Sequence, residues 1–140
     1  MADSDWGGGY VTDLEYIEGY YTQQSPSQLA LACTLRGIAA ALPGPDEPVS
    51  YLELGCGHGI GALVLAAANP AWRVTAVDYN PAHIAGARAA AAAAGIGNIT
   101  FIEADLSTMA GSEAARAIPE ADFTSMHGVW TWVGPEVRAG

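Results

Sequence analysis

One stretch of the sequence combines a carboxylate with a glycine-dense turn, in the pattern Glu53-x-Gly55-x-Gly57-x-Gly59. A short apolar segment precedes it and a segment rich in alanine and leucine follows it, so the turn is expected to join a strand to a helix. Glycine permits the sharp reversal and lets a ligand approach the backbone without a Cβ in between. The unpaired N–H groups at the start of the helix favour a polar or anionic ligand group. The stretch therefore predicts a nucleotide-type binding turn.

A polar or acidic group also closes each of the other strands that the sequence predicts. In a parallel sheet, the ligand lies beyond the carboxyl ends of the strands. The strand ends are therefore candidates for one shared site, and they are Glu53, Asp78-Tyr79-Asn80, Glu103-Ala104-Asp105-Leu106 and His127-Gly128.

The three acids at these strand ends have different candidate roles. Asp78 follows Gly57 by 21 residues, the spacing at which a carboxylate accepts hydrogen bonds from ribose hydroxyls. The competing role, the cap of the next helix, is already filled by Asn80. Asp105 is either a loop carboxylate or cap, or an acceptor for an adenine amino group. Glu53 closes a buried strand, where an unpaired carboxylate is costly, so we expect it to pair with backbone donors or a cationic ligand group.

Apolar strands and helices alternate along the chain after a linker at residues 43–48. This alternation predicts a doubly wound, right-handed, Rossmann-like parallel α/β sheet that is covered on both faces. The expected strands are 49–54, 73–77, 99–103 and 121–126, and the expected helices are 25–42, 60–68, 80–94 and 109–118.

The N-terminal residues 1–24 are expected to form a mobile tail followed by a short helix from Thr12 to Tyr21, before a domain at residues 25–140. Thr12 is a helix cap by sequence, with an acid three residues later. The tyrosines Tyr16, Tyr20 and Tyr21 either pack against the next helix or form a lid over a cofactor.

Composition excludes several classes of function. At 140 residues the chain is long enough for one domain that buries about two thirds of its unfolded surface. A net charge of −10 with five Lys and Arg disfavours nucleic acid as a partner. The acidic start is unlike a signal peptide, and no apolar run approaches the ~18 residues of a membrane span. Cys33 and Cys56 have no CxxC partner, which favours reduced thiols in a cytoplasmic protein, and no metal-ligand spacing is present.

Taken together, the strand ends resemble class I S-adenosylmethionine-dependent methyltransferases over about residues 49–137. The run from Glu53 to Gly59 resembles their first motif, and Asp78 resembles their ribose acid. Residues 103–106 resemble their adenine-side motif, and residues 122–130 resemble their fourth strand and the following loop. The resemblance implies S-adenosyl-L-methionine as the cofactor, and it places around it Glu53, Gly55, Cys56, Gly57, Gly59, Asp78, Tyr79, Ala104, Asp105, Leu106, His127 and Gly128.

The end of the chain departs from that family. Residues 127–133 are similar to bacterial methyltransferase domains that are followed by a methyltransferase regulatory domain. Class I enzymes have seven strands, whereas only four are predicted here, and residues 135–138 resemble the start of a further helix. We therefore expect a fragment of a longer protein, or a partner such as the missing C-terminal half or a regulatory domain. The open edge of the fourth strand favours association.

Methyl transfer from a sulfonium is mainly a problem of positioning two reactants. His127 is the candidate general base for an acceptor that arrives protonated, or it merely lines the methionine pocket. His58 is interpreted as a spacer in the turn and His83 as a solvated side chain. Trp130 and Trp132 either flank the substrate entrance or pack at the edge of the core.

Two other functions stay open. The run Gly57-x-Gly59-x-x-Ala62, with Asp78 downstream, fits a nicotinamide-dependent oxidoreductase, although such a turn requires neither Glu53 nor Asp105. The third hypothesis is a cofactor-binding fragment without catalysis. For the methyl acceptor, a small molecule, a protein side chain and a nucleic acid remain, in that order.

Overall fold

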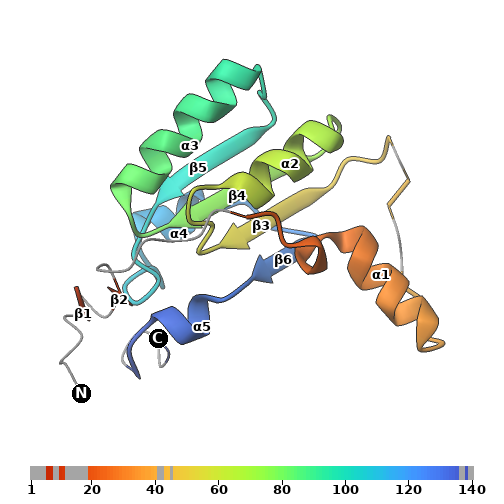
Figure 1. Cartoon of the computed structure of the whole chain (residues 1–140), viewed down its shortest axis with the longest axis horizontal. Helices are drawn as coiled ribbons and strands as arrows, with labels where there is room; N and C mark the ends of the chain where they lie inside the picture. Colours follow the sequence, from red (N-terminus) through yellow and green to blue (C-terminus); the bar gives the residue numbers. More distant parts are fainter. Residues whose placement is uncertain are drawn as a thin grey trace.

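The computed structural model describes residues 6–7, 10–11, 19–40, 43–44, 46–135 and 138. Four parallel strands form a central sheet in the order β5-β4-β3-β6, and helices alternate with them along the chain (Figure 1). The predicted doubly wound, Rossmann-like α/β fold is confirmed. Its strands are β3 (Ser50–Leu54), β4 (Arg73–Asp78), β5 (Ile99–Glu103) and β6 (Phe123–Met126), and the helices that follow them are α2 (Ile60–Ala68), α3 (Pro81–Ala94), α4 (Glu113–Ala117) and α5 (Val129–Trp132).

The strand order places the switch point of the sheet between β3 and β6. From β3 the chain moves outward to β4 and β5, and it then crosses back to pair β6 with the other side of β3. Ligands of such sheets bind beyond the carboxyl ends of the strands at the switch point. The residues after Leu54 and Met126, which are partners in register, therefore mark the expected site.

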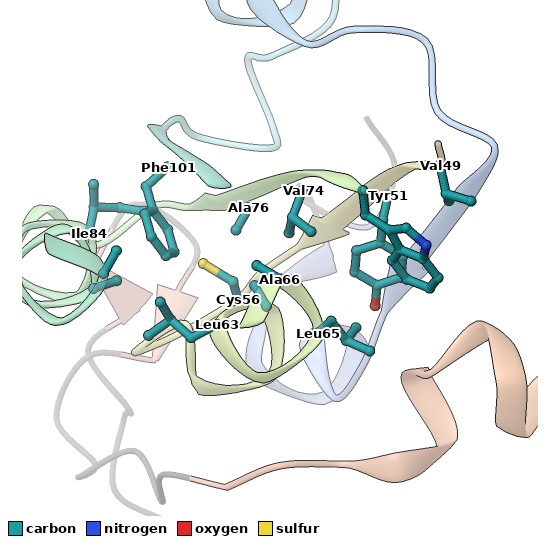
Figure 2. Packing of buried hydrophobic residues seen from close by; sticks show 14 residues of the cluster. Val49, Tyr51, Cys56, Leu63, Leu65, Ala66, Val74, Ala76, Ile84 and Phe101 are labelled. Carbon is teal, nitrogen blue, oxygen red and sulfur yellow. The ribbon is translucent and has the colours of Figure 1, made fainter. Parts of the chain in front are cut away.

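The main core lies between the sheet and helices α2 and α3. Figure 2 shows Tyr51, Val74 and Ala76 pointing from their strands toward α2. Tyr51 is 2% exposed, and its ring stacks on Trp72 with centroids 6.4 Å apart. Small residues on the two helices permit this close packing, and the fully buried ones include Ala62, Ala66 and Ala87.

The opposite face of the sheet is covered only in part. Thr75 and Val77 of the central strand are buried there, but Leu54 is half-buried and Met126 is 52% exposed. Helix α4 has no buried residue. The expectation of a sheet covered on both faces is therefore correct for β4 and wrong near β6.

Helices α2 and α3 have the predicted bounds because short-range signals fix their ends. The side chain of Asn80 accepts a hydrogen bond from the N–H of Ala82 at 2.9 Å, and Pro81 occupies the first turn. Gly95 ends the same helix with a φ of 67°. The run of alanines between them is helical throughout, as predicted.

Helix α1 (Pro26–Leu35) is shorter than the predicted helix, which extended to residue 42. Gly37, with a φ of 73°, closes a Schellman motif after it. The N–H of Gly37 donates to the carbonyl of Thr34 at 2.9 Å, and the N–H of Ile38 donates to that of Cys33 at 3.0 Å. The helix projects away from the sheet (Figure 1), with exposed apolar side chains at Leu29, Leu31 and Leu35.

The described N-terminal residues contain two short strands and one helical turn. Strands β1 (Trp6–Gly7) and β2 (Tyr10–Val11) form a short antiparallel pair. The predicted helix from Thr12 to Tyr21 falls largely outside the described residues, as does Tyr16, while Tyr20 and Tyr21 are not helical. A single 3₁₀ turn, η1 (Thr22–Gln24), precedes α1. The division of the chain after residue 24 remains a prediction.

The last elements are shorter than predicted. Helix α4 spans five residues instead of 109–118, and β6 begins at Phe123 instead of residue 121. Helix α5 was not predicted; it begins after Gly128, which has a φ of 75°. The helix start predicted at residues 135–138 falls partly outside the described residues. None of the helices described here combines the length and the apolar character that crossing a membrane requires.

Candidate functional site

The glycine turn is fastened to the central strand by backbone hydrogen bonds. The N–H groups of Gly55 and Cys56 both donate to the carbonyl oxygen of Val77, at 2.8 and 3.0 Å. Gly55, Gly57 and Gly59 have φ values of 71°, 55° and 74°, a region that side-chain-bearing residues rarely adopt. The predicted strand–turn–helix unit is confirmed.

Two of these glycines are required by the packing of the protein itself. A Cβ at Gly55 would overlap the side chain of Val129 at the start of α5. A Cβ at Gly59 would lie 2.8 Å from Cε1 of Phe101 and 3.0 Å from the Cβ of Ala87. Close contact between helices and sheet explains both positions, so the glycine pattern alone is no proof of a ligand.

Asp78 organises the same turn from the end of β4. Its Oδ2 accepts a hydrogen bond from the N–H of Gly57 at 2.8 Å, and its Oδ1 accepts one from the N–H of Asn80 at 2.9 Å. Since the side chain of Asn80 caps helix α3, Asp78 is not the helix cap. The carboxylate holds the glycine turn against β4, and its role toward a ribose remains a prediction.

Glu53 is the buried acid of the site, at 4% exposure. Its Oε1 accepts a hydrogen bond from Nε2 of Gln24 at 3.2 Å, and its Oε2 has no hydrogen-bond partner among the described residues. Burial raises the pKa of Glu53 to about 7; the hydrogen bond from Gln24 lowers it, and the charge of Asp78 raises it. The expected partner was a backbone donor or a ligand, but the observed partner is a side-chain amide. A cationic ligand group as partner of the second oxygen remains a prediction.

A pocket that is partly open to solvent lies at the switch point. Of the predicted site residues, the pocket brings together Glu53, Gly55, Cys56 and His127. Its other walls come from the start of α2 and from residues before α1. Ile60 and Gly61 form the wall from α2, and Gly19 and Gln24 are lining residues that the sequence did not indicate.

His127 lies at this pocket beneath the N-terminal residues. The ring of Tyr21 stacks on its imidazole, with centroids 4.4 Å apart and an interplanar angle of 29°. Nε2 of Gln23 lies 3.2 Å from Nε2 of His127. Tyr21 also lines the pocket, which favours the lid interpretation of this tyrosine, whereas Tyr20 is 40% exposed.

The predicted adenine-side residues lie beside Asp78 and not in the pocket. The N–H of Ala104 donates to the carbonyl of Asp78 at 3.0 Å. Oδ1 of Asp105 accepts hydrogen bonds from the N–H and the hydroxyl of Ser107 at 2.8 and 2.6 Å, as a loop carboxylate does. Ala104, Asp105 and Leu106 are not among the lining residues of the pocket. Their contact with adenine remains a prediction.

Of the other predicted cofactor residues, Cys56 lines the pocket, while Tyr79 and Gly128 are not among its lining residues. Burial raises the pKa of the Cys56 thiol, whose Sγ lies 3.6 Å from the carbonyl oxygen of Gly57. This thiol belongs to the core, so only its backbone can face a ligand. Tyr79 is 37% exposed, and Gly128 precedes α5.

Two histidines depart from their predicted roles. His58 lines the pocket, and its ring lies 4.2 Å from the ring of His83. His83 is not a solvated side chain: it is 20% exposed, and its Nδ1 lies 3.4 Å from Oδ1 of Asp78. Trp130 is 59% exposed, while the side chain of Trp132 is outside the described part. Within the described part, no group of three His, Cys, Asp or Glu side chains could hold a metal.

The sequence of residues 52–132 matches the family described as "Methyltransferase domain". The match covers more than half of the chain and all four strand ends. The chain belongs to the methyltransferase domain family. This membership agrees with the resemblance seen in the motifs, and it favours a methyltransferase over a nicotinamide-dependent oxidoreductase.

Relatives of this methyltransferase domain are longer than the chain. The chain is 35% identical over 133 residues to the uncharacterized protein sll1526 of Synechocystis sp.. The alignment covers 95% of this chain and 25% of that protein. The chain therefore spans about a quarter of the length of the curated relative that it matches.

Solved structures agree on the fold. PKMT2 from Rickettsia typhi, in complex with AdoHcy, has a TM-score of 0.73 at 22% identity, covering 89% of this chain and 22% of that one. TrmN from Thermus thermophilus has a TM-score of 0.50 at 28% identity, covering 76% of this chain and 30% of that one.

Proposed function

We propose that the chain supplies the cofactor-binding part of an S-adenosyl-L-methionine-dependent methyltransferase, which transfers a methyl group to an acceptor not yet identified. The observation that carries the proposal is the switch-point pocket, which is lined by Glu53, a buried acid with one carboxylate oxygen that has no hydrogen-bond partner among the described residues. A carboxylate in this position suits the ammonium group at the amino-acid end of the cofactor. The AdoHcy bound to the Rickettsia protein of the same fold supports this ligand class.

The other strand ends offer groups that fit the rest of the cofactor. The carboxylate of Asp78 suits ribose hydroxyls, and the acid and backbone N–H of the third strand end suit the edge of adenine. The backbone of the glycine turn can approach a ligand closely. We assign to this site Glu53, Gly55, Cys56, Gly57, Gly59, Asp78, Tyr79, Ala104, Asp105, Leu106, His127 and Gly128.

The bound cofactor supplies an activated methyl group, and the residues of the chain orient the reactants. Nε2 of Gln23 lies 3.2 Å from Nε2 of His127, so the amide side chain can hold the imidazole in one orientation. A histidine at this strand end is the candidate general base for an acceptor that arrives protonated. Stacking on Tyr21 fixes the plane of the imidazole.

The methyl acceptor and a protein partner of the chain are proposed on the following grounds. A net charge of −10 favours a small molecule or a protein side chain over nucleic acid as the acceptor. The remaining sheet or a regulatory domain is a further candidate partner, because β6 forms an edge of the described sheet. Localisation in the cytoplasm is proposed from the two free cysteines.

Calorimetric titration of the chain with S-adenosylhomocysteine, with NAD as the parallel control, tests the proposal. We expect binding of S-adenosylhomocysteine alone. Binding of NAD, or of neither ligand by a folded sample, would contradict it for this chain. Binding without methyl transfer to any acceptor would favour the non-catalytic alternative.

A further inference from the structure

Residues Tyr21 to Gln24, here called the strap, cross the carboxyl ends of β3 and β6 just before α1. Gln24 bonds to Glu53 at the end of β3, and Gln23 contacts His127, which follows β6. Two consecutive side chains thus reach the two strands that flank the switch point. The pairs are 29 and 104 positions apart in the sequence, so the fold alone creates them.

The strap is anchored at its backbone as well as by its side chains. The hydroxyl of Tyr51 donates to the carbonyl oxygen of Gln24 at 3.3 Å, and it lies 2.6 Å from the hydroxyl of Ser125 on β6. Gln24 is 7% exposed, which is uncommon for an amide side chain. A buried, hydrogen-bonded amide of this kind fixes one geometry.

Helix α2 closes over the same pair. A Cβ at Gly61 would lie 3.4 Å from both carboxylate oxygens of Glu53 and 3.5 Å from Oε1 of Gln24. The carboxylate of Glu53 therefore lies between Gln24 of the strap and Gly61 of the helix, and it has little freedom to turn.

We infer that Gln23 and Gln24 are positioning residues: Gln24 orients the carboxylate of Glu53 toward the pocket, and Gln23, with Tyr21, orients the imidazole of His127. The inference deepens the proposed function and rests on it only for the identity of the ligand.

The protonation of Glu53 gives the inference a measurable consequence. Asp78 faces Glu53 and raises its pKa, and Glu53 in turn acts on Tyr51 and Cys56. Tyr21, His58 and His127 line the same pocket. The hydrogen bond from Gln24 works in the opposite direction, because it lowers the pKa of Glu53. Without it, more of the carboxyl is neutral near pH 7 and unable to attract a cationic group.

The first test needs no ligand. The carboxyl ¹³C resonance of Glu53 is followed against pH in the wild-type chain, in Gln24→Met, which keeps the side-chain volume, and in Gln28→Met, a matched change at an exposed glutamine of α1. We expect Gln24→Met alone to raise the midpoint by at least ~0.5 pH units. A midpoint equal to that of the control would overturn the role of Gln24.

The second test applies to the other half of the strap. Imidazole ¹⁵N shifts report the tautomer of His127, and Gln23→Met should change the ratio of the two tautomers because the amide contact with Nε2 is lost. An unchanged tautomer would contradict the role of Gln23.

The third test is the affinity for S-adenosylhomocysteine as a function of pH. Gln24→Met should weaken binding about three- to tenfold near pH 6.5 and less than about twofold at pH 9, where Glu53 is ionised in both proteins. An equal loss at both pH values would indicate general damage to the pocket and would contradict positioning. If the wild-type chain does not bind, the proposed function fails, while the titration of Glu53 still decides on the strap.

Discussion

At the scale of single residues, Asp78 shows how one carboxylate serves structure and a candidate ligand together. Both of its oxygens accept backbone hydrogen bonds, from Gly57 and Asn80. Oδ1 also lies 3.4 Å from Nδ1 of His83, so Oδ2 is the oxygen with a lone pair left for a ribose hydroxyl. We expect Asp78→Ala to weaken binding of S-adenosylhomocysteine by at least ~1 kcal/mol and to lower the free energy of unfolding by about 1–3 kcal/mol. Calorimetry and urea unfolding measure the two effects separately.

Asp122 offers the control for that change. Its Oδ2 also accepts a backbone hydrogen bond, from Ser50 at 2.8 Å, but at the opposite end of β3. Asp122→Ala should therefore lower stability without changing the affinity for S-adenosylhomocysteine. If both variants bind like the wild type, the ribose assignment of Asp78 is wrong.

At the scale of elements, helix caps differ in a way that the sequence did not reveal. Ser25 and Asn80 both precede a proline, and both are residue types that cap helices. Only Asn80 makes the side-chain bond, to Ala82, whereas Ser25 makes none. We expect Asn80→Ala to cost about 1 kcal/mol in the free energy of unfolding and Ser25→Ala a few tenths at most, measured by urea unfolding. Equal costs would contradict the observed capping.

Elements with their own end signals were predictable from the sequence, and those without were not. The bounds of α2 and α3 follow from proline, glycine and asparagine at their ends. The sequence predicts too long a helix α1, because Gly37 lies inside the predicted range and closes a Schellman motif there. Helix α5 has four residues, too few to show a periodic pattern.

The residues of the candidate site also divide into those that the sequence predicts and those that it does not. Glu53, the glycine turn and Asp78 were predictable because strand ends and glycine spacing are visible locally. The strap was not, because neither Gln23 nor Gln24 stands in any pattern. Their partners are fixed only when β3 and β6 become neighbours in the sheet.

At the scale of the whole molecule, the net negative charge of the chain and the buried carboxyl of Glu53 together determine how stability depends on pH. Burial raises the pKa of Glu53 from 4.5 to about 7, so the folded state binds a proton that the unfolded state has lost between these values. Its contribution to stability is therefore full below about pH 4.5 and is lost as the pH rises through about 7. The difference of about 2.5 pH units corresponds to ~3 kcal/mol, as an order of magnitude.

We predict that the free energy of unfolding falls between pH 5 and pH 8. Urea unfolding at low and at high salt measures this fall. Repulsion within a chain of net charge −10 also grows with pH, but salt screens this surface term and leaves the buried one. Glu53→Gln should abolish the part of the fall that persists at high salt, whereas Glu120→Gln, at an exposed position, should not.

A cationic ligand group at Glu53 would favour the ionised carboxylate. The stabilisation by S-adenosylhomocysteine should then be larger at pH 8 than at pH 5, and the opposite order would show that its ammonium group does not meet Glu53.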